Sequence, residues 1–133
     1  MQSINKIKEY NKESQDLLKS CLLNIAVVSN NLGKYKETIL NCNKVLKIDD
    51  KLVKAYYLRA IAHSKTHDYE SGIEDIKQAI KLSPSDKLLR DEFENIKSLK
   101  QKHLQSQQQS MKSFFSGGLY QDKPVPQQKA GLP

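Results

Sequence analysis

Two basic side chains, Lys54 and Arg59, lie among tyrosines and aliphatic residues in the stretch VKAYYLRAIAH, residues 53–63. Ammonium and guanidinium groups hold carboxylates through charge-assisted hydrogen bonds, which are stronger than bonds between neutral groups. The stretch could therefore line a groove that binds a peptide. A solvated helix edge is the alternative, and these residues alone leave both interpretations open.

The other candidate residues do not support catalytic or metal-binding chemistry. His63 and His67 are spaced i, i+4, but the residues between them lack the Glu of the zinc-protease helix. His103 has no surrounding pattern of Cys or carboxylates that is typical of a metal site or a catalytic triad. Gly117 and Gly118 follow no predicted strand, so they do not form a phosphate-binding loop. We expect neither enzymatic activity nor a metal or cofactor.

Composition narrows the range of partners. The net charge is +7, but 20 of the 22 basic residues are Lys, and residues 100–133 hold five Lys against one acid. A basic tail of this kind is weak support for nucleic-acid binding. No apolar run approaches the roughly 20 residues of a membrane span, and the first ten residues are too polar for a signal peptide. We expect a cytoplasmic protein that binds neither nucleic acid nor membrane, with Cys21 and Cys42 both reduced and buried.

The elements that position these residues are predicted to be helices. Gly33, Gly72 and Pro84 are the only strong helix breakers before residue 117, whereas the last 17 residues contain three Gly and three Pro. Apolar residues recur at helical spacing between the breakers. Ser83 has the position of an N-cap for the last helix. The predicted helices are 14–31, 35–48, 51–66, 69–82 and 85–112.

The sequence repeats itself with a shift of 34 residues, which superimposes Ala26 on Ala60 and Tyr35 on Tyr69. This period is that of a helix-turn-helix repeat, in which each hairpin leaves an apolar face for the next hairpin to cover. Residues 19–86 resemble two tetratricopeptide repeats, with the small and the aromatic residues where that family expects them. The resemblance implies an all-α fold, an α-solenoid of two repeats followed by a long C-terminal capping helix and an irregular tail.

Three segments follow from this organisation. Residues 1–13 are expected to be an N-terminal remnant or partial helix, because Ile4, Ile7 and Tyr10 have helical spacing but the segment is too short for a full hairpin. Residues 14–99 would hold the repeats and the cap, and residues 100–133 the extended helix end and a flexible tail. Helical arrays usually need about three repeats. The chain is therefore expected to be a piece of a larger protein, or to associate with itself or a partner through its N-terminal face.

One subgroup of tetratricopeptide domains binds the C-terminal carboxylates of a Glu-Glu-Val-Asp peptide, the tail of heat-shock chaperones. The resemblance to this subgroup rests on Asn24 in CLLNIA and Lys54 in VKAYYLRA. Leu58 occupies the position of the subgroup's arginine, and Arg59 lies about 100° further round the helix. The groove residues that the family implies are Asn24, Val27, Asn31, Lys54, Tyr57 and Ile61, with Arg59 as a further candidate for peptide binding.

The wider resemblance is to the C-terminal repeat domain of FKBP-type and cyclophilin-type immunophilins. It rests on CLLNIAVVSNNLGKYKETILNCNKVLKI, residues 21–48, and on the ending FFSGGLYQDKP, residues 114–124. It implies a co-chaperone-like module that binds a peptide or a chaperone tail, without the isomerase domain of those proteins. The alternative is a scaffold subunit of a larger assembly that has lost the clamp, which Leu58 and the missing first repeat favour.

Overall fold

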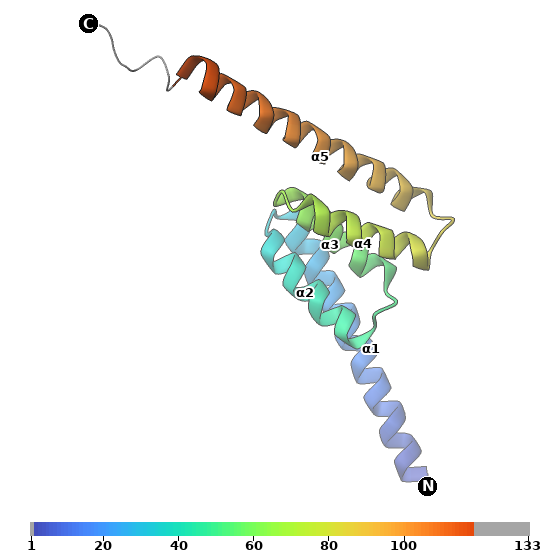
Figure 1. The fold of residues 1–133 in the computed structure, drawn as a ribbon. Coiled ribbons are helices and arrows are strands. Elements are labelled where there is room, and N and C mark those ends of the chain that lie inside the picture. The colour runs from blue at the N-terminus through green and yellow to red at the C-terminus, as the bar shows by residue number, and fades with distance from the viewer. Residues whose placement is uncertain (1, 119–133) are drawn as a thin grey trace, which may run out of the picture. The chain divides into compact units, whose positions relative to one another are not determined.

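The computed structural model describes residues 2–118, and every regular element in this range is helical (Figure 1). The prediction of an all-α fold is confirmed. Two compact units make up the structure, residues 1–97 and 98–133. The elements are α1 (Gln2–Asn31), α2 (Tyr35–Ile48), α3 (Val53–Lys65), α4 (Tyr69–Leu82), α5 (Lys87–Ser113) and a π-helical turn (Phe114–Gly118).

The first hairpin packs α1 against α2 through a small residue. Ala26 is fully buried, which allows the two helices to approach closely. Gly33 has a φ of +78° in the turn after α1, a left-handed conformation that glycine adopts without strain. α2 then begins at Tyr35, as predicted. Thr38 is buried where the repeat expects a smaller residue, and its hydroxyl is satisfied because it donates to the carbonyl oxygen of Lys34 at 3.2 Å.

The second hairpin repeats this arrangement with α3 and α4. Ala60 is fully buried, and a Cβ placed on Gly72 would lie 3.1 Å from the carbonyl oxygen of Ala60. Close packing at this point therefore requires glycine or a displacement of the two helices. α4 begins at Tyr69, as predicted, and the side chain of Asp68 caps it by accepting the N–H of Ser71 at 3.3 Å.

The two hairpins pack on each other through two clusters of buried residues. Both clusters combine side chains from α1, α2 and α3, so α3 fills the groove that the first hairpin leaves open. This stacking makes each repeat depend on its neighbour for burial. The first cluster is Leu22, Val45 and Ala55, and the second is Ala26, Cys42 and Leu58.

The beginning of α5 covers the end of the second hairpin. Leu89 and Ile96 are 2% and 0% exposed, and they pack in one cluster with Ala60, Ile76 and Ala79. An end helix of this kind shields the apolar face that a further repeat would otherwise cover. The packing agrees with the capping role expected for this helix.

Three predicted helix starts are wrong. The third helix begins at Val53 rather than at residue 51. The first helix begins at Gln2 rather than at residue 14, so residues 2–13 continue the helix without a break. The last helix begins at Lys87, because Ser83 is already the C-cap of α4. Asp86 provides the N-cap instead, since its Oδ1 accepts the N–H of Leu88 at 3.0 Å.

Three further expectations concern the cysteines, the tail and the membrane. Cys42 is buried as expected, but Cys21 is exposed, so the prediction that both are buried is wrong for Cys21. Cys21 lies on a side of α1 that none of the described helices covers. The predicted irregular tail falls largely outside the described residues, although Phe114–Gly118 continues the helix as a π-turn. Within residues 2–118 no helix has both the length and the hydropathy needed to cross a bilayer.

Candidate functional site

α1 presents three of the predicted groove residues, Asn24, Val27 and Asn31. Their spacing of three and four residues keeps them on one side of the helix. Asn24 and Asn31 are exposed, whereas Val27 is half-buried and packs against the cluster that contains Ala26. This part of α1 therefore offers two amide side chains beside an apolar contact.

α3 presents Lys54, Tyr57 and Ile61 with the same spacing, and α3 packs beside α1. Lys54 is exposed and forms no ion pair with any residue of the described range. It is the second residue of α3, whose N-cap residue, Leu52, provides no side-chain hydrogen bond. The partial positive charge of a helix N-terminus adds to that of a nearby ammonium group. This end of α3 is therefore favourable for an anion.

Tyr57 and Ile61 are half-buried and supply the apolar part of this face. Burial raises the pKa of Tyr57 above its ordinary value of 10.0, and the negative charges of Glu92 and Asp86 raise it further. The phenol therefore keeps its proton at neutral pH. Because these two acids disfavour a second negative charge near Tyr57, an anionic group is better accommodated at Lys54.

Leu58 and Arg59 are adjacent in sequence but contact different helices. Leu58 is 6% exposed and packs with Ala26 of α1 and Cys42 of α2. Arg59 donates from Nε and Nη2 to the two carboxylate oxygens of Asp75 in α4, at 2.8 and 2.6 Å. This difference agrees with the helix rotation of about 100° per residue. Leu58 is a core residue, and Arg59 does not take the place of the missing arginine.

The pair of Arg59 and Asp75 is a structural feature of the domain. The side chain of Asp75 is only 9% exposed, and the Nη1 of Arg59 also donates to the Oδ1 of Asn43 at 2.8 Å. The guanidinium lies 5.7 Å from the centre of the Tyr56 ring, within the range of a cation–π contact. The Asp75 carboxylate raises the pKa of Arg59 above its ordinary value. These contacts connect α2, α3 and α4.

The sequence reasoning missed Asp75 and Asn43 as partners of Arg59. A signal was present in the 34-residue alignment, because Arg59 corresponds to Ile25 and Asp75 corresponds to Asn41. A base and an acid thus occur together in the second hairpin where the first has two uncharged residues. Such a coupled difference is expected when two side chains touch.

Asn30 of α1 was also missed. Its Oδ1 is buried and has no hydrogen-bond donor among the described residues. A buried acceptor without a donor costs about 1 to 3 kcal/mol, so such atoms are uncommon unless another molecule supplies the donor. Asn30 directly precedes the exposed Asn31, which places this acceptor at the edge of the face formed by α1 and α3.

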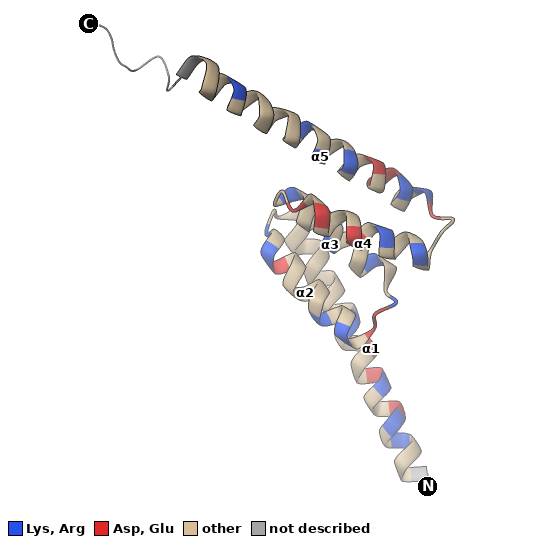
Figure 2. Cartoon of the chain, in the orientation of Figure 1, with Lys and Arg blue, Asp and Glu red and all other residues tan. Residues whose placement is uncertain are grey.

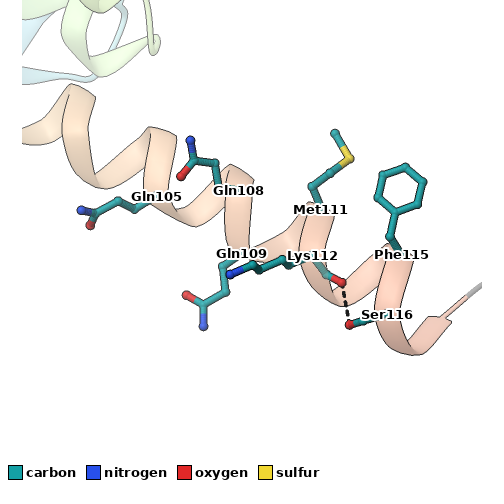
Figure 3. Close-up of a pocket in the computed structure, with 7 residues that line it drawn as sticks. All are labelled: Gln105, Gln108, Gln109, Met111, Lys112, Phe115 and Ser116. Carbon is teal, nitrogen blue, oxygen red and sulfur yellow. Dashed lines mark hydrogen bonds between the residues drawn. The ribbon is translucent and has the colours of Figure 1, made fainter.

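Pockets of about 350, 560 and 780 Å³ lie outside this face. The smallest lies at the turn between α1 and α2, and that of about 560 Å³ lies beside the ion pair of Arg59 and Asp75. That of about 780 Å³ belongs to the unit 98–133, and its side chains come from successive turns near the end of α5 (Figure 3). Those side chains are all exposed, so this surface is open rather than enclosed. The pocket beside the ion pair of Arg59 and Asp75 is lined by Leu40, Asn43, Lys44, Leu46, Lys47, Tyr56 and Arg59.

The histidines and the charges give no indication of a catalytic or metal centre. Each ring nitrogen of His63 lies 3.7 Å from a carboxylate oxygen, one of Asp68 and one of Asp75. Residues 2–118 contain no group of three or more His, Cys, Asp or Glu that could hold a metal ion. Basic and acidic residues are interspersed along α1, whereas the later part of α5 carries basic residues only (Figure 2).

Residues 53–86 match the tetratricopeptide repeat family over the hairpin of α3 and α4. This segment is a tetratricopeptide repeat. The hairpin of α1 and α2 has the same small and aromatic residues, Ala26 and Tyr35, at the equivalent positions. A tetratricopeptide repeat domain is a non-catalytic module for protein–protein interaction, so the chain contains a module of this class.

Curated proteins of two kinds are similar to the chain. The chain is 33% identical over 97 residues to the peptidyl-prolyl cis-trans isomerase FKBP42 of Arabidopsis thaliana, covering 73% of this chain and 27% of that protein. It is 40% identical over 60 residues to the DnaJ protein P58IPK homolog A of Oryza sativa subsp. japonica, covering 45% of this chain and 13% of that protein. The chain thus spans only a minor part of these relatives.

A solved structure has the same fold. It is the C-terminal TPR-containing domain of an FK506-binding protein of Plasmodium falciparum, with a TM-score of 0.65 and 29% identity. The match covers 71% of this chain and 62% of that one. The predicted tetratricopeptide-like solenoid and the resemblance to immunophilin repeat regions are confirmed.

Proposed function

We propose that the face formed by α1 and α3 binds an acidic peptide that ends in a free carboxylate, such as the C-terminal tail of a chaperone. The observation that supports this most directly is the position of Lys54. It is exposed, has no ion-pair partner within residues 2–118, and lies at the uncapped start of α3. Tyr57 and Ile61 lie on the same side of α3, where they would contact an aliphatic side chain of the peptide.

The asparagines of α1 support an extended peptide as the ligand. A side-chain amide both donates and accepts, so Asn24 and Asn31 can bond to the N–H and C=O groups of a peptide backbone. Both side chains are exposed, so a peptide can reach them. A peptide aligned with α1 and α3 would thus satisfy groups that the domain leaves open.

The affinity is expected to be low because, among the residues of this face within the described range 2–118, Lys54 is the only cation without an acidic partner. Leu58 is buried, and Arg59 is bonded to Asp75, so neither adds a charged donor. Each missing charge-assisted bond costs about 1.5 to 3 kcal/mol, which places the dissociation constant on the order of tens of micromolar or weaker. Binding should weaken further as salt screens the charges.

Calorimetric titration of the chain with an acidic peptide, in free-acid and amidated forms, tests this proposal. Lys54→Ala should weaken binding at least about tenfold, since it removes one charge-assisted bond. Lys77→Ala is the matched control, because Lys77 is an exposed lysine on α4, away from this face. Amidation of the wild-type ligand should have an effect similar to that of Lys54→Ala. Equal binding by both variants and both peptides would refute the carboxylate site.

The variant Leu58→Arg, which the sequence comparison suggests for restoring the arginine, is unsuitable for this test. It would place a charge in the cluster of Leu58, Ala26 and Cys42, where burial without a partner is costly. Its expected effect is a loss of stability rather than a gain in affinity.

A second candidate is a structural subunit of a larger assembly that binds no chaperone peptide. It is supported by Leu58 at the arginine position and by a long row of exposed apolar residues on α1. The same titration distinguishes the two, because a purely structural subunit would bind neither form of the peptide. For either function we propose a cytoplasmic location, since Cys21 is exposed and free, as thiols are in a reducing compartment.

A further inference from the structure

α1 carries an apolar stripe that no other described helix covers. We call it the outer stripe. Single exposed apolar residues are ordinary, but a continuous row of large ones on one helix marks an interaction surface. Residues 3–18 are all exposed, so the first half of α1 has no contact with the core (Figure 1). The outer stripe is Ile4, Ile7, Tyr10, Leu17, Leu18, Ile25, Val28 and Leu32, each between 47% and 74% exposed.

The spacing of the stripe is that of a two-stranded coiled coil. Positions 4, 11, 18, 25 and 32 alternate with positions 7, 14, 21 and 28, which gives steps of three and four residues over four heptads. Asn11, Ser14 and Cys21 occupy three of these seam positions, and the other six are aliphatic. None of the seven charged residues of α1 lies at a seam position. A second helix can therefore lie along this seam without burying a charge.

The length of the stripe indicates what kind of helix covers it. The stripe spans 29 residues, whereas α2, α3 and α4 have 14, 13 and 14 residues. A helix of repeat size would cover only about half of the stripe at a rise of about 1.5 Å per residue. The α1 helix of a second copy has the required length, 30 residues, and carries the same heptad spacing of apolar residues. We propose that the outer stripe binds the outer stripe of a second copy of this chain, with the two α1 helices parallel and in register.

Parallel pairing matches the polar positions of the two helices. In register, Asn11 faces the second copy's Asn11, Ser14 faces Ser14, and aliphatic positions face aliphatic ones. An antiparallel pair that overlaps over the same span, 4–32, would place Asn11 opposite Ile25, and one that overlaps over 4–28 would place it opposite Cys21. Both leave the amide of Asn11 without a good partner. A single buried Asn at such a position is known to fix register and the number of strands in coiled coils.

The seam is exposed beside the face of α1 that packs on the domain. The buried residues Leu22 and Ser29 lie three and four residues from Ile25, so the core face of α1 adjoins the seam. The apolar residues of the outer stripe are nevertheless 47% to 74% exposed, which leaves them accessible to a second helix. The inference does not rest on peptide binding, although Asn24 and Asn31 of the proposed peptide face lie four and three residues from Val28 of the seam and therefore adjoin it.

Sedimentation equilibrium of the full chain tests the pairing. We expect a mass of twice 15.2 kDa at high concentration and dissociation on dilution from about 100 to 1 µM, by mass action. Leu18→Lys and Ile7→Lys, which place a charge in the seam, should give a monomer at every concentration. Ser20→Lys is the control with the same new charge on the same helix, because Ser20 is exposed but outside the seam. It should remain a dimer.

Circular dichroism separates loss of pairing from loss of folding. Leu18 and Ile7 are 49% and 60% exposed, so both lysine variants should keep the helix content and the unfolding midpoint of the diluted wild-type monomer. A wild-type chain that stays monomeric at the highest concentration overturns the proposal. It is equally overturned if Ser20→Lys dissociates the dimer as fully as Leu18→Lys.

Cross-linking tests the parallel register. Cys21 lies at a seam position and would meet the second copy's Cys21, so oxidised glutathione should join the two thiols in a disulfide while it is reduced to two glutathione thiols. Cys42 serves as the internal control, because it is fully buried and burial raises its pKa to about 11. Cys21→Ser should abolish the linked dimer. A dimer that forms by mass but does not cross-link through Cys21 overturns the parallel arrangement.

Discussion

Burial assigns different roles to three nearby residues of α3. Lys54 is exposed and free of ion pairs within the described range, Leu58 is 6% exposed in the core, and Arg59 bonds to Asp75. Their positions on the helix explain the difference, because each faces a different neighbour. A cation in this segment is therefore a candidate ligand-binding group only if no acid from another helix pairs with it.

The ion pair of Arg59 and Asp75 should be important for stability. Asp75→Asn is expected to lower the free energy of unfolding by about 3 kcal/mol, because it leaves the charge of Arg59 partly buried without its partner. Urea unfolding measures this change. Asp91→Asn is the control, since Asp91 is exposed and should change stability by less than about 0.5 kcal/mol. If the two variants are equally stable, the pair behaves as an ordinary surface contact.

A double variant separates the pair from the individual residues. Arg59→Ile combined with Asp75→Asn introduces the residues that the first hairpin has at Ile25 and Asn41. In the double variant no unpaired charge is left in the domain, whereas Asp75→Asn alone leaves that of Arg59. The loss of stability should therefore be smaller for the double variant. A larger loss for the double variant would mean that the contacts of Arg59 with Asn43 and Tyr56 dominate.

At the scale of the elements, small residues and helix ends determine how the helices pack. Ala26 and Ala60 let each hairpin close, and the glycine at position 72 lets α4 approach the backbone of α3. α5 contributes differently, because it adds no hairpin and instead covers the apolar end of the second one. The contribution of α5 to the stability of the fold therefore comes from a few buried side chains on one face of this helix.

Two adjacent leucines of α5 test this role. Leu89 is 2% exposed in the cluster with Ile76, whereas Leu88 is 56% exposed. Leu89→Ala should lower the free energy of unfolding by about 2 to 5 kcal/mol, since it leaves a cavity in the core. Leu88→Ala should change it by less than about 1 kcal/mol. Chemical denaturation measures both, and equal effects would show that α5 does not pack on the hairpin in this register.

At the scale of the whole molecule, the buried clusters of residues 1–97 are linked by shared helices. Cys42 belongs to the cluster that joins α1, α2 and α3, and it is fully buried. The ionisation of its thiol is therefore coupled to opening of the domain. Because the folded state disfavours the thiolate, the unfolded state releases this proton at lower pH.

This coupling predicts a loss of stability at alkaline pH. Burial raises the pKa of Cys42 from its ordinary value of 9.0 to about 11. Its contribution is fully present below pH 9.0 and is lost as the pH rises through about 11, by up to about 3 kcal/mol. Cys42→Ala should lack this part of the decline, so the difference between the two pH profiles isolates it from other titrating groups. Parallel profiles would contradict the burial of the thiol.

The sequence by itself determined the features that depend on local chemistry. The starts of α2 and α4 were predicted at Tyr35 and Tyr69, because the aromatic residue and the 34-residue repeat mark both positions and Gly33 also precedes the first. Helix type followed from apolar spacing and from the lack of breakers. The extent of α1 was underestimated, because residues 1–13 are too short for a hairpin and nothing in the sequence shows that they continue the helix that follows.

Only the tertiary structure decided which side chains are available to a partner. The sequence placed Lys54 and Arg59 in one candidate groove, but the acid that pairs with Arg59 lies 16 residues away on α4. It also suggested that Cys21 and Cys42 are alike, although Cys21 is exposed at a seam position of α1 and Cys42 is buried in the core. Exposure depends on which helix packs on which, and that packing brings together residues distant in sequence. Local spacing defines the faces of each helix, whereas the neighbouring helices determine which faces remain free to bind.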